Sequence, residues 1–262
     1  MSQIRALGVL VRDDTQPYPL ESLQRLLDGA RVRMHLLNNG LPTERLDVVV
    51  AMGGDGTVLK ALDMMPDCPV LAINFGTVGF LTAGDRAELE QLVGRLLAGD
   101  FVVSERVLLR CQHPGGTAHV VNEVVLRSSW RLMSVDVTVN GAHIRSIRAD
   151  GVIVGTPTGS TGYLLSTGAP IVMPDVSCFV LDGLNEYNFT SRALILSPDS
   201  KIRLLVTALH GGEEARVYID GNAVGALEVG QQLLLERSPR RAQLIFFDPN
   251  YFFHNLTSRL RW

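Results

Sequence analysis

The segment of this 262-residue chain with the clearest chemical signature is Gly53–Thr57, which reads GGDGT. Glycines let the backbone turn sharply and approach a ligand closely, and exposed N–H groups at a helix start bind anions such as phosphate. The Asp55 carboxylate would repel phosphate, so it is better suited to act as a base or as a ligand for Mg²⁺. A structural turn with a capping aspartate is the alternative. The chain has no GxxxxGK[ST] segment, which disfavours P-loop chemistry.

A second candidate segment runs from Asp150 to Tyr163 and reads DGVIVGTPTGSTGY. A short apolar run leads into a loop of Gly, Thr and Ser, whose small donors and bare amides suit a polar, phosphate-bearing ligand. The Tyr163 ring could stack on a base or anchor the loop. An ordinary polar loop is the alternative interpretation.

The third candidate is the pair Asn122-Glu123 inside the apolar run VVNEVVL. An amide and a carboxylate are costly to bury unless hydrogen bonds satisfy them. Asn can offer a donor and an acceptor together to a purine edge, as it does when proteins read adenine, and a carboxylate accepts from ribose hydroxyls. Outward-facing residues at a strand end are the alternative.

The elements that position these segments change in character along the chain. Up to about residue 99, strand-like runs alternate with helical spacing, which is typical of a parallel α/β sheet. Leu46–Met52 is a β-branched run suited to a strand buried on both faces, and it ends at the first glycine turn. We expect a helix after it from about Thr57 to Met65, and a second glycine-containing turn, Asn74–Phe80, beside the first.

From Phe101 onward, short β-type runs are separated by Gly, Pro, Asn and Ser, which indicates a second, mostly β domain. Val120–Leu126 is taken as one strand-like run. Asn140-Gly141 predicts a hairpin turn, because Asn-Gly tolerates the positive φ values of a type I′ turn. Asp220-Gly221-Asn222 predicts another.

Composition excludes several classes of protein. The net charge of −3 argues against nucleic acid as a partner, and no apolar run approaches the length of a membrane span. Three widely spaced cysteines and scattered histidines give no disulfide framework and no metal-ligand spacing. We expect a cytoplasmic protein, with no signal peptide, and buried cysteines.

Taken together and in this order, the segments resemble the NAD kinase family. GGDGT by itself is shared with lipid kinases and resembles the phosphofructokinase site, whereas PTGST preceded by NE is much more specific. The matching segments are Gly53–Thr57, Asn74–Leu81, Asn122–Leu126, Asp150–Tyr163, Gly168–Pro174, Ser191-Arg192, Asp220-Gly221 and the C-terminal FF…LRW ending.

The resemblance implies an enzyme that transfers a phosphoryl group from ATP, or from polyphosphate, to the 2′-hydroxyl of the adenosine ribose of NAD. It implies Mg²⁺ or another divalent metal as cofactor, and Asp55 as the catalytic base. The positions that it assigns to binding NAD and ATP are Gly53, Gly54, Asp55, Gly56, Thr57, Lys60, Asn122, Glu123, Arg148, Asp150, Thr161, Gly162, Tyr163, Ser166, Asn185 and Asn222.

The resemblance also implies the fold class, α/β plus all-β. An N-terminal Rossmann-like nucleotide-binding domain is expected over residues 1–99 and a C-terminal β-sandwich that binds NAD over 100–236. The segment 237–262 is expected to pack back on the first domain, and the chain to form a homodimer or homotetramer.

The chain departs from the family pattern at a few positions. Gly162 stands where alanine is more usual, Asn222 where glutamine is common, and Ala193 where proline is usual. The stretch 181–191 lacks the proline and histidine that we expect there, so it bears on subunit contacts.

Two other functions would fit part of the sequence. A lipid kinase would share GGDGT, but would leave the NE and PTGST segments without a reason. A non-catalytic dinucleotide sensor would keep the pocket, but would have no need of Asp55 and its glycines.

Overall fold

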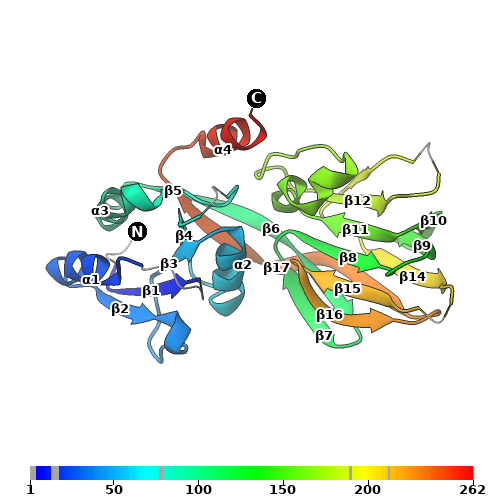
Figure 1. Ribbon diagram of the computed structural model, residues 1–262, viewed down its shortest axis with the longest axis horizontal. Coiled ribbons are helices and arrows are strands. Elements are labelled where there is room, and N and C mark those ends of the chain that lie inside the picture. Colours follow the sequence, from blue (N-terminus) through cyan, green and yellow to red (C-terminus); the bar gives the residue numbers. More distant parts are fainter. Residues whose placement is uncertain (1–3, 13–17, 77–78, 189–190, 212, 262) are drawn as a thin grey trace. The chain divides into compact units, whose positions relative to one another are not determined.

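The computed structural model describes residues 4–12, 18–76, 79–188, 191–211 and 213–261 (Figure 1). The chain forms two compact units. Unit 1 comprises Met1–Glu105 and Ala242–Trp262, and unit 2 comprises Arg106–Arg241. Strands β6 (Val102–His113) and β17 (Gln232–Phe246) each contribute residues to both units.

Unit 1 is an α/β unit in which strands and helices alternate, as the sequence predicted. The hydrogen-bonded order is β2-β1-β3-β4, all parallel, and the last residues of β17 pair in parallel with β4. The elements are β1 (Ala6–Val11), α1 (Leu20–Gly29), β2 (Arg33–Leu36), β3 (Val48–Gly53), α2 (Asp55–Met64), β4 (Val70–Asn74), β5 (Gly84–Asp85), α3 (Leu89–Ala98) and α4 (Tyr251–Leu260), with short 3₁₀ turns at Leu37–Asn39 and Arg86–Glu88.

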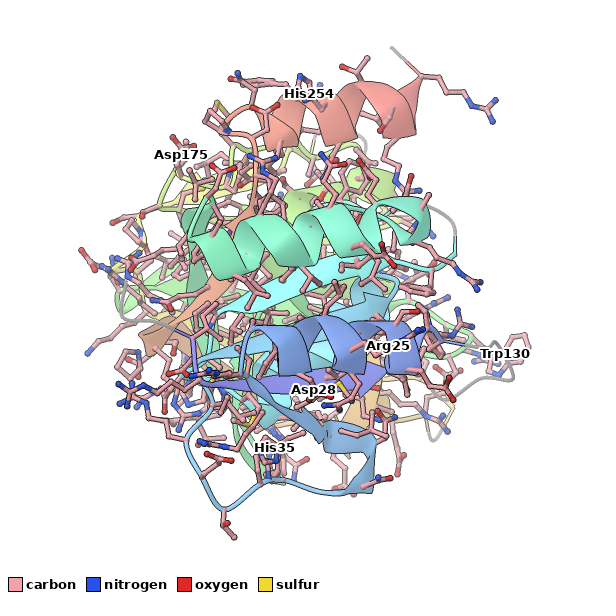
Figure 2. All side chains as sticks on the ribbon, turned by 90° about the vertical axis from the view of Figure 1, so that its left-hand side faces the viewer. Arg25, Asp28, His35, Trp130, Asp175 and His254 are labelled. Atoms are coloured by element: carbon pink, nitrogen blue, oxygen red, sulfur yellow. The ribbon has the colours of Figure 1, made fainter. Side chains whose placement is uncertain are left out.

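Helices α1 and α3 lie side by side against one face of this sheet (Figure 2). Their apolar residues, such as Leu27 and Leu96, are fully buried with Leu7, Val50 and Ile73 of the strands in one core. Strand β3 is buried along its whole length, as its β-branched sequence predicted. This rigid base fixes the point at which β3 ends and helix α2 begins.

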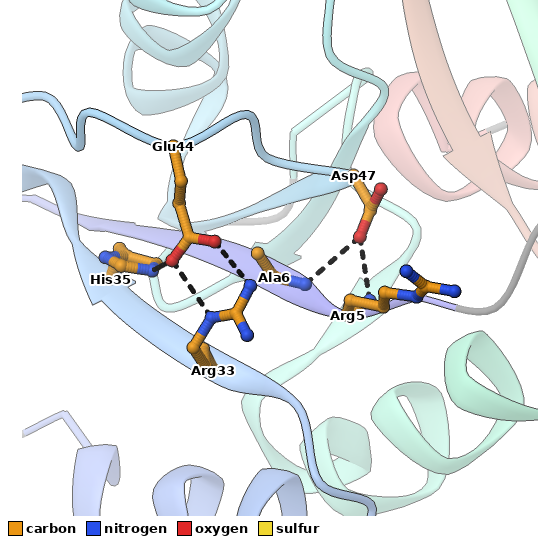
Figure 3. A network of polar contacts seen from close by, with 6 residues as sticks. All are labelled: Arg5, Ala6, Arg33, His35, Glu44 and Asp47. Carbon is orange, nitrogen blue, oxygen red and sulfur yellow. Dashed lines mark hydrogen bonds and ion pairs between the residues drawn. The ribbon is translucent and has the colours of Figure 1, made fainter.

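Two groups of polar contacts tie the segment before β3 to edge strand β2, through Glu44, and to the start of β1, through Asp47 (Figure 3). Glu44 accepts hydrogen bonds from Arg33 Nε at 3.0 Å and lies 2.6 Å from His35 Nε2. Asp47 accepts the backbone N–H groups of Arg5 and Ala6. Charged side chains along an edge strand discourage pairing with other chains.

Unit 2 is a β-sandwich, so the predicted fold class is confirmed for both units. One sheet has the order β10-β9-β14-β17, with β6 pairing β17 and β7, and the other has the order β13-β12-β11-β8-β15-β16. The remaining bounds are β7 (Gly116–Val120), β8 (Glu123–Arg127), β9 (Met133–Val139), β10 (Ala142–Ala149), β11 (Gly151–Gly155), β12 (Phe179–Leu184), β13 (Leu194–Leu196), β14 (Ile202–Ala208), β15 (Ala215–Ile219) and β16 (Asn222–Leu227), with 3₁₀ turns at Thr158–Thr161 and Tyr163–Thr167.

The two sheets of unit 2 enclose a single apolar core. Val124, Val152 and Phe179 of the six-stranded sheet are buried in one cluster with Val137 and Leu204 of the facing sheet. The other face of the six-stranded sheet is covered as well. There Val125 and Ile153 pack with Leu164 and Ala169 of the segment that follows β11. This packing holds the PTGST loop against the sheet.

Both predicted hairpin turns of unit 2 are confirmed. Asn140 and Gly141 have φ values of 51° and 85°, and Asp220 and Gly221 have 46° and 82°. The prediction of one strand over Val120–Leu126 is wrong, because β7 ends at Val120 and β8 begins at Glu123. The cause is the Asp220 carboxylate, which accepts the N–H groups between the two strands.

The three cysteines, Cys68, Cys111 and Cys178, are buried and free, as predicted. None of the helices in the described part of the chain has the length and hydropathy of a membrane-spanning segment.

Candidate functional site

The Asp55 carboxylate lies at the start of helix α2 and is held by backbone donors from the second glycine-containing turn. The N–H of Phe80 donates to Oδ2 at 3.0 Å, and the N–H of Leu81 donates to Oδ1 at 3.1 Å. A Cβ on Gly79 would lie 1.8 Å from Asp55 Oδ1, so this approach requires glycine. The two turns therefore lie together, as predicted, although Thr77 and Val78 lie outside the described residues.

A cavity of about 360 Å³ adjoins the GGDGT turn within unit 1. Its walls combine bare backbone, a hydroxyl and two basic side chains at the N-terminus of a helix. This combination favours phosphate, because N–H groups and helix dipole both attract negative charge there. The residues that line it are Val11, Arg12, Gly54, Gly56, Thr57 and Lys60.

The three glycines of this turn serve different purposes. A Cβ on Gly53 would lie 2.1 Å from Thr57 Oγ1, so Gly53 is required by the fold. No atom lies within 4 Å of the positions that a Cβ on Gly54 or Gly56 would take, yet both residues line the cavity. These two glycines keep the space open for a ligand.

In unit 2, Glu123 is a buried carboxyl group with a perturbed pKa. Its residue is only 7% exposed. Burial, reinforced by the nearby Asp220 charge, raises the pKa of Glu123 to about 7, against the opposing effect of a hydrogen bond from the Tyr163 N–H. Its Oε2 atom is buried and accepts no hydrogen bond from the described residues. Such an oxygen suits a hydroxyl donor from a ligand.

The PTGST loop is built onto Asn122 and Glu123. Thr156 N–H donates to the Asn122 carbonyl at 2.9 Å, and a Cβ on Gly159 would lie 2.2 Å from the same oxygen. A Cβ on Gly162 would lie 3.1 Å from Glu123 Oε2 and 3.8 Å from Asn122 Nδ2. The structure thus brings together Asn122, Glu123, Gly162 and Tyr163, and Thr161 and Ser166 lie on the same 3₁₀ turns.

Asp220 organises this group. The sequence indicated it as a turn residue and as part of the matching segment Asp220-Gly221, but not as the acceptor for these N–H groups. Its carboxylate accepts N–H groups from Val121, Asn122 and Glu123 at 2.9, 2.7 and 3.2 Å. The exposed Asn222 lies two residues further on, at the start of β16. The signal in the sequence was an Asp-Gly pair that a hairpin alone would explain.

The other predicted residues lie elsewhere. Arg148, Asp150 and Asn185 are gathered where β11 begins and β12 ends, and Asn185 Nδ2 donates to Asp150 Oδ2 at 2.8 Å. Glu123 pairs with Gly155 at the other end of β11. The strand between them is buried along its length. At about 3.3 Å per residue, the two groups are more than about 13 Å apart.

Sequence reasoning placed the turn Asn74–Phe80 beside the first one but did not assign its backbone to Asp55, and it missed Arg12. A glycine in a turn indicates that another group approaches the backbone closely, but it does not indicate which side chain does so. The sequence could therefore have suggested a close contact at Gly79, but not that Asp55 makes it. No cluster of three or more His, Cys, Asp or Glu side chains suited to a metal ion occurs among the described residues. The Thr57 hydroxyl lines the cavity, and Asp55 belongs to the same turn.

Two family models match the chain. The ATP-NAD kinase N-terminal domain matches residues 31–101, and the ATP-NAD kinase C-terminal domain matches residues 121–247. Among curated proteins, the NAD kinase of Gemmatimonas aurantiaca is 37% identical, covering 83% of this chain and 78% of its own length. The NAD kinase of Alcanivorax borkumensis is 32% identical, covering 99% of this chain and 95% of its own length.

Solved structures show the same fold. An NAD kinase from Archaeoglobus fulgidus in complex with ATP matches with a TM-score of 0.81 and 27% identity, over 98% of each chain. Yeast NADH kinase complexed with NADH matches with a TM-score of 0.87 and 21% identity, over all of this chain and 89% of that one.

Proposed function

This chain belongs to the NAD kinase family and has that family's activity, and we propose that Asp55 is the base that activates the 2′-hydroxyl of NAD. The observation that carries the proposal is the Asp55 carboxylate held by two backbone N–H groups, in a turn whose glycines on either side of Asp55 line a cavity. Those donors fix the carboxylate's direction and leave lone pairs on both oxygens. A base placed in this way is ready to accept a proton from an alcohol.

The cavity beside the turn is proposed to hold the phosphates of ATP. Lys60, the Thr57 hydroxyl and the backbone of Gly54 and Gly56 supply the contacts, since these residues line the cavity and amides at the start of α2 attract phosphate oxygens. Transfer is in line. The 2′-oxygen of NAD attacks the γ-phosphorus, Asp55 takes the hydroxyl proton, and ADP leaves with the electron pair of the broken bond. Positioning and charge stabilisation supply most of the rate.

NAD is proposed to bind through the group around Glu123. Ionised Glu123 accepts ribose hydroxyls through its unpartnered oxygen, and Asn122 offers its amide to the adenine edge. Tyr163 provides an aromatic surface for stacking. Further contacts are assigned to Thr161, Gly162, Ser166 and Asn222, which lie on the same turns or next to Asp220.

A divalent metal ion such as Mg²⁺ fits this donor set. Mg²⁺ keeps several waters and is bound through one or two carboxylates plus substrate phosphates, rather than by a cage of protein ligands. Asp55 and Thr57 supply hard oxygens from the turn that borders the cavity, and so meet that need. When bound, the ion neutralises charge on the triphosphate. Asp55 and Thr57 are the side chains that would hold it.

Asp150 and Arg148 are proposed to contact NAD bound to a second copy of the chain. They lie at the opposite end of β11 from Glu123, and the strand between is buried, so NAD has no exposed path along it. In a homodimer, the end of the sheet that carries Glu123 in one copy could face the end that carries Asp150 in the second copy. Both carboxylates would then contact one NAD molecule. The stretch 181–191 lies at the same end as Asp150.

The test is Asp55→Asn, assayed for NADP formation with ATP, Mg²⁺ and NAD. We expect kcat to fall at least about 10²-fold, the lower range for general-base catalysis. NAD binding, measured by calorimetry, should stay within several-fold of wild type. A variant with near-normal turnover would remove Asp55 from the mechanism. Repeating the assay with polyphosphate in place of ATP determines the range of donors.

A further inference from the structure

Three consecutive residues after strand β12, Asn185 to Tyr187, reach across to strand β10 and to Asp150. Asn185 Nδ2 donates to Asp150 Oδ2 at 2.8 Å. Tyr187 N–H donates to the Arg148 carbonyl at 2.9 Å, and the Arg148 guanidinium lies over the Tyr187 ring at 5.3 Å. We call residues 185–187 the strap. It lies in the stretch where this chain departs from the family pattern.

The middle residue anchors the strap. The Glu186 side chain is only 8% exposed and forms an ion pair with Arg145 of β10 at 3.5 Å. It also accepts a hydrogen bond from Ser191 Oγ, and Ser191 is bonded in turn to Arg145. The Ser191 hydroxyl thus links the two members of the ion pair, and these joint contacts restrain the backbone of the strap. Asn185 is therefore presented to Asp150 from a fixed backbone.

Asp150 itself has a fixed backbone and a free oxygen. Its N–H donates to the Leu184 carbonyl and its carbonyl accepts from the Ser128 N–H, both at 2.9 Å. Only rotation of the side chain remains, and Asn185 restrains that rotation through Oδ2. Among the described residues, no hydrogen bond reaches Oδ1. That oxygen is left to accept from a ligand.

The identity of residue 185 meets two requirements at once. Its φ of 50° lies in the left-handed region, which Asn and Gly adopt more readily than other residues. Only Asn of these two also has a side-chain N–H to give to a carboxylate.

We propose that Asn185 is a positioning residue for NAD recognition: it aims the Asp150 carboxylate at the hydroxyls of NAD and does not itself need to touch the ligand. This proposal rests on the proposed role of Asp150. It assigns a function to the strap. The strap departs from the family pattern, and it contacts Asp150, which matches that pattern.

The first variant is Asn185→Gly, which keeps the left-handed backbone and removes only the amide. We expect KM for NAD to rise about tenfold, the usual loss for one hydrogen bond to a charged group. kcat and KM for ATP should be unchanged, because the variant removes a hydrogen bond that is proposed to act on NAD binding alone. A merely structural role would lower the amount of folded enzyme without separating KM from kcat.

The second variant is Asn185→Asp, which places a carboxylate where the donor was. We expect the ratio of the variant's KM for NAD to the wild-type KM at the same pH to be largest at pH 8 and to fall toward pH 6. The reason is that two close carboxylates retain a proton, and the protonated one donates again. A ratio that does not change with pH would contradict the proposal.

Asn140→Gly is the matched control. Asn140 also has a left-handed backbone, φ 51°, and its side chain accepts the Lys201 N–H at 2.9 Å in the β9–β10 turn. Asn140→Gly removes an Asn amide from the same backbone conformation, but at a site away from Asp150. KM for NAD should therefore stay at the wild-type value.

Asp150→Ala separates the two proposals. If it raises KM for NAD while Asn185→Gly does not, the role of Asn185 is overturned and that of Asp150 stands. If Asp150→Ala leaves KM unchanged, both roles are overturned, while the Asp55 mechanism is unaffected. If both raise KM and the double variant is no worse than Asp150→Ala, the two residues act as one unit, as proposed.

Discussion

At the scale of single residues, the two acidic groups of the proposed site are in opposite situations. Asp55 receives two backbone N–H donors, whereas Glu123 is buried beside another carboxylate with one oxygen unpartnered. Donors fix a carboxylate in direction and favour its charged form, while burial favours its neutral form. The arrangement of Asp55 suits a base that accepts a proton from one direction. The arrangement of Glu123 suits a carboxylate that accepts a hydrogen bond from a bound ligand.

Glu123 should make the stability of the protein depend on pH. Its pKa is raised to about 7 in the folded protein, above its ordinary value, so the folded state holds the proton more tightly. The resulting stability is fully present below pH 4.5 and is lost as pH rises to 7, by up to about 3 kcal/mol. Urea unfolding at pH 5 and pH 8 measures this change.

Glu123→Gln provides the comparison, because the amide cannot ionise. Between pH 5 and pH 8 its free energy of unfolding should rise relative to that of wild type. Parallel pH curves for the two proteins would mean that Glu123 titrates at an ordinary pKa.

Gly79→Ala should lower activity by displacing the Asp55 carboxylate, although Asp55 itself is unchanged. Its Cβ would lie 1.8 Å from Asp55 Oδ1 and so displace the carboxylate. A shift of about 1 Å in a catalytic group costs on the order of 10²-fold in rate, which steady-state assays of kcat measure. Gly76→Ala, in the same turn, has no atom within 4 Å of the new Cβ and should retain activity. Equal losses in the two variants would contradict this account.

At the scale of elements, the residues at the junction of β3 and α2 have different roles, some in the fold and some in the proposed binding site. Gly53 is required because Thr57 packs against it, whereas Gly54 and Gly56 border open space. The helix starts at Asp55, so the proposed base and the helix N-terminus proposed to bind phosphate come from the same turn. A strand-to-helix junction of this kind provides a binding site at little cost to the sheet.

Gly56→Ala and Gly53→Ala should therefore have contrasting effects. Alanine at 56 favours helix α2 by up to about 1 kcal/mol, but its methyl group enters the cavity, so we expect KM for ATP to rise about tenfold. Alanine at 53 clashes with Thr57 and should destabilise the fold by about 1–3 kcal/mol. Thermal unfolding together with KM for ATP distinguishes them. A Gly56→Ala enzyme with unchanged KM would show that the cavity does not hold phosphate.

At the scale of the whole molecule, unit 2 presents its proposed NAD contacts at both ends of one buried strand. Glu123 and Asp150 are thus assigned to the same ligand through two copies of the chain. Under this proposal, oligomerisation is part of substrate binding. It also explains why residues that share one motif, Asp150 to Tyr163, do not share one place in the structure.

Mixing two defective proteins tests this assembly. Glu123→Ala and Asp150→Ala should each bind NAD weakly. In a mixed dimer one site carries both defects and the other carries none, so random mixing should restore about a quarter of wild-type activity at low NAD. Refolding the two variants together and assaying NADP formation measures this. Activity no greater than the average of the two parents would place both residues in the same copy.

The sequence by itself determined the features that depend on neighbouring residues. β-Branched runs gave buried strands such as β3, glycines gave the turn before α2, and Asn140-Gly141 gave a hairpin, because backbone conformation and side-chain period are local properties. The alternation before residue 99 and the short strands after it predicted the fold class. The order of motifs identified the family.

Only the tertiary structure decided which of these features meet. Asp55 finds its donors 25 and 26 residues away, at Phe80 and Leu81. Asp220 lies 98 residues from Asn122, whose N–H it accepts, and this contact broke the strand predicted over Val120–Leu126. Such pairings depend on the order and register of strands throughout the sheet, because a shift of one residue turns every side chain to the other face.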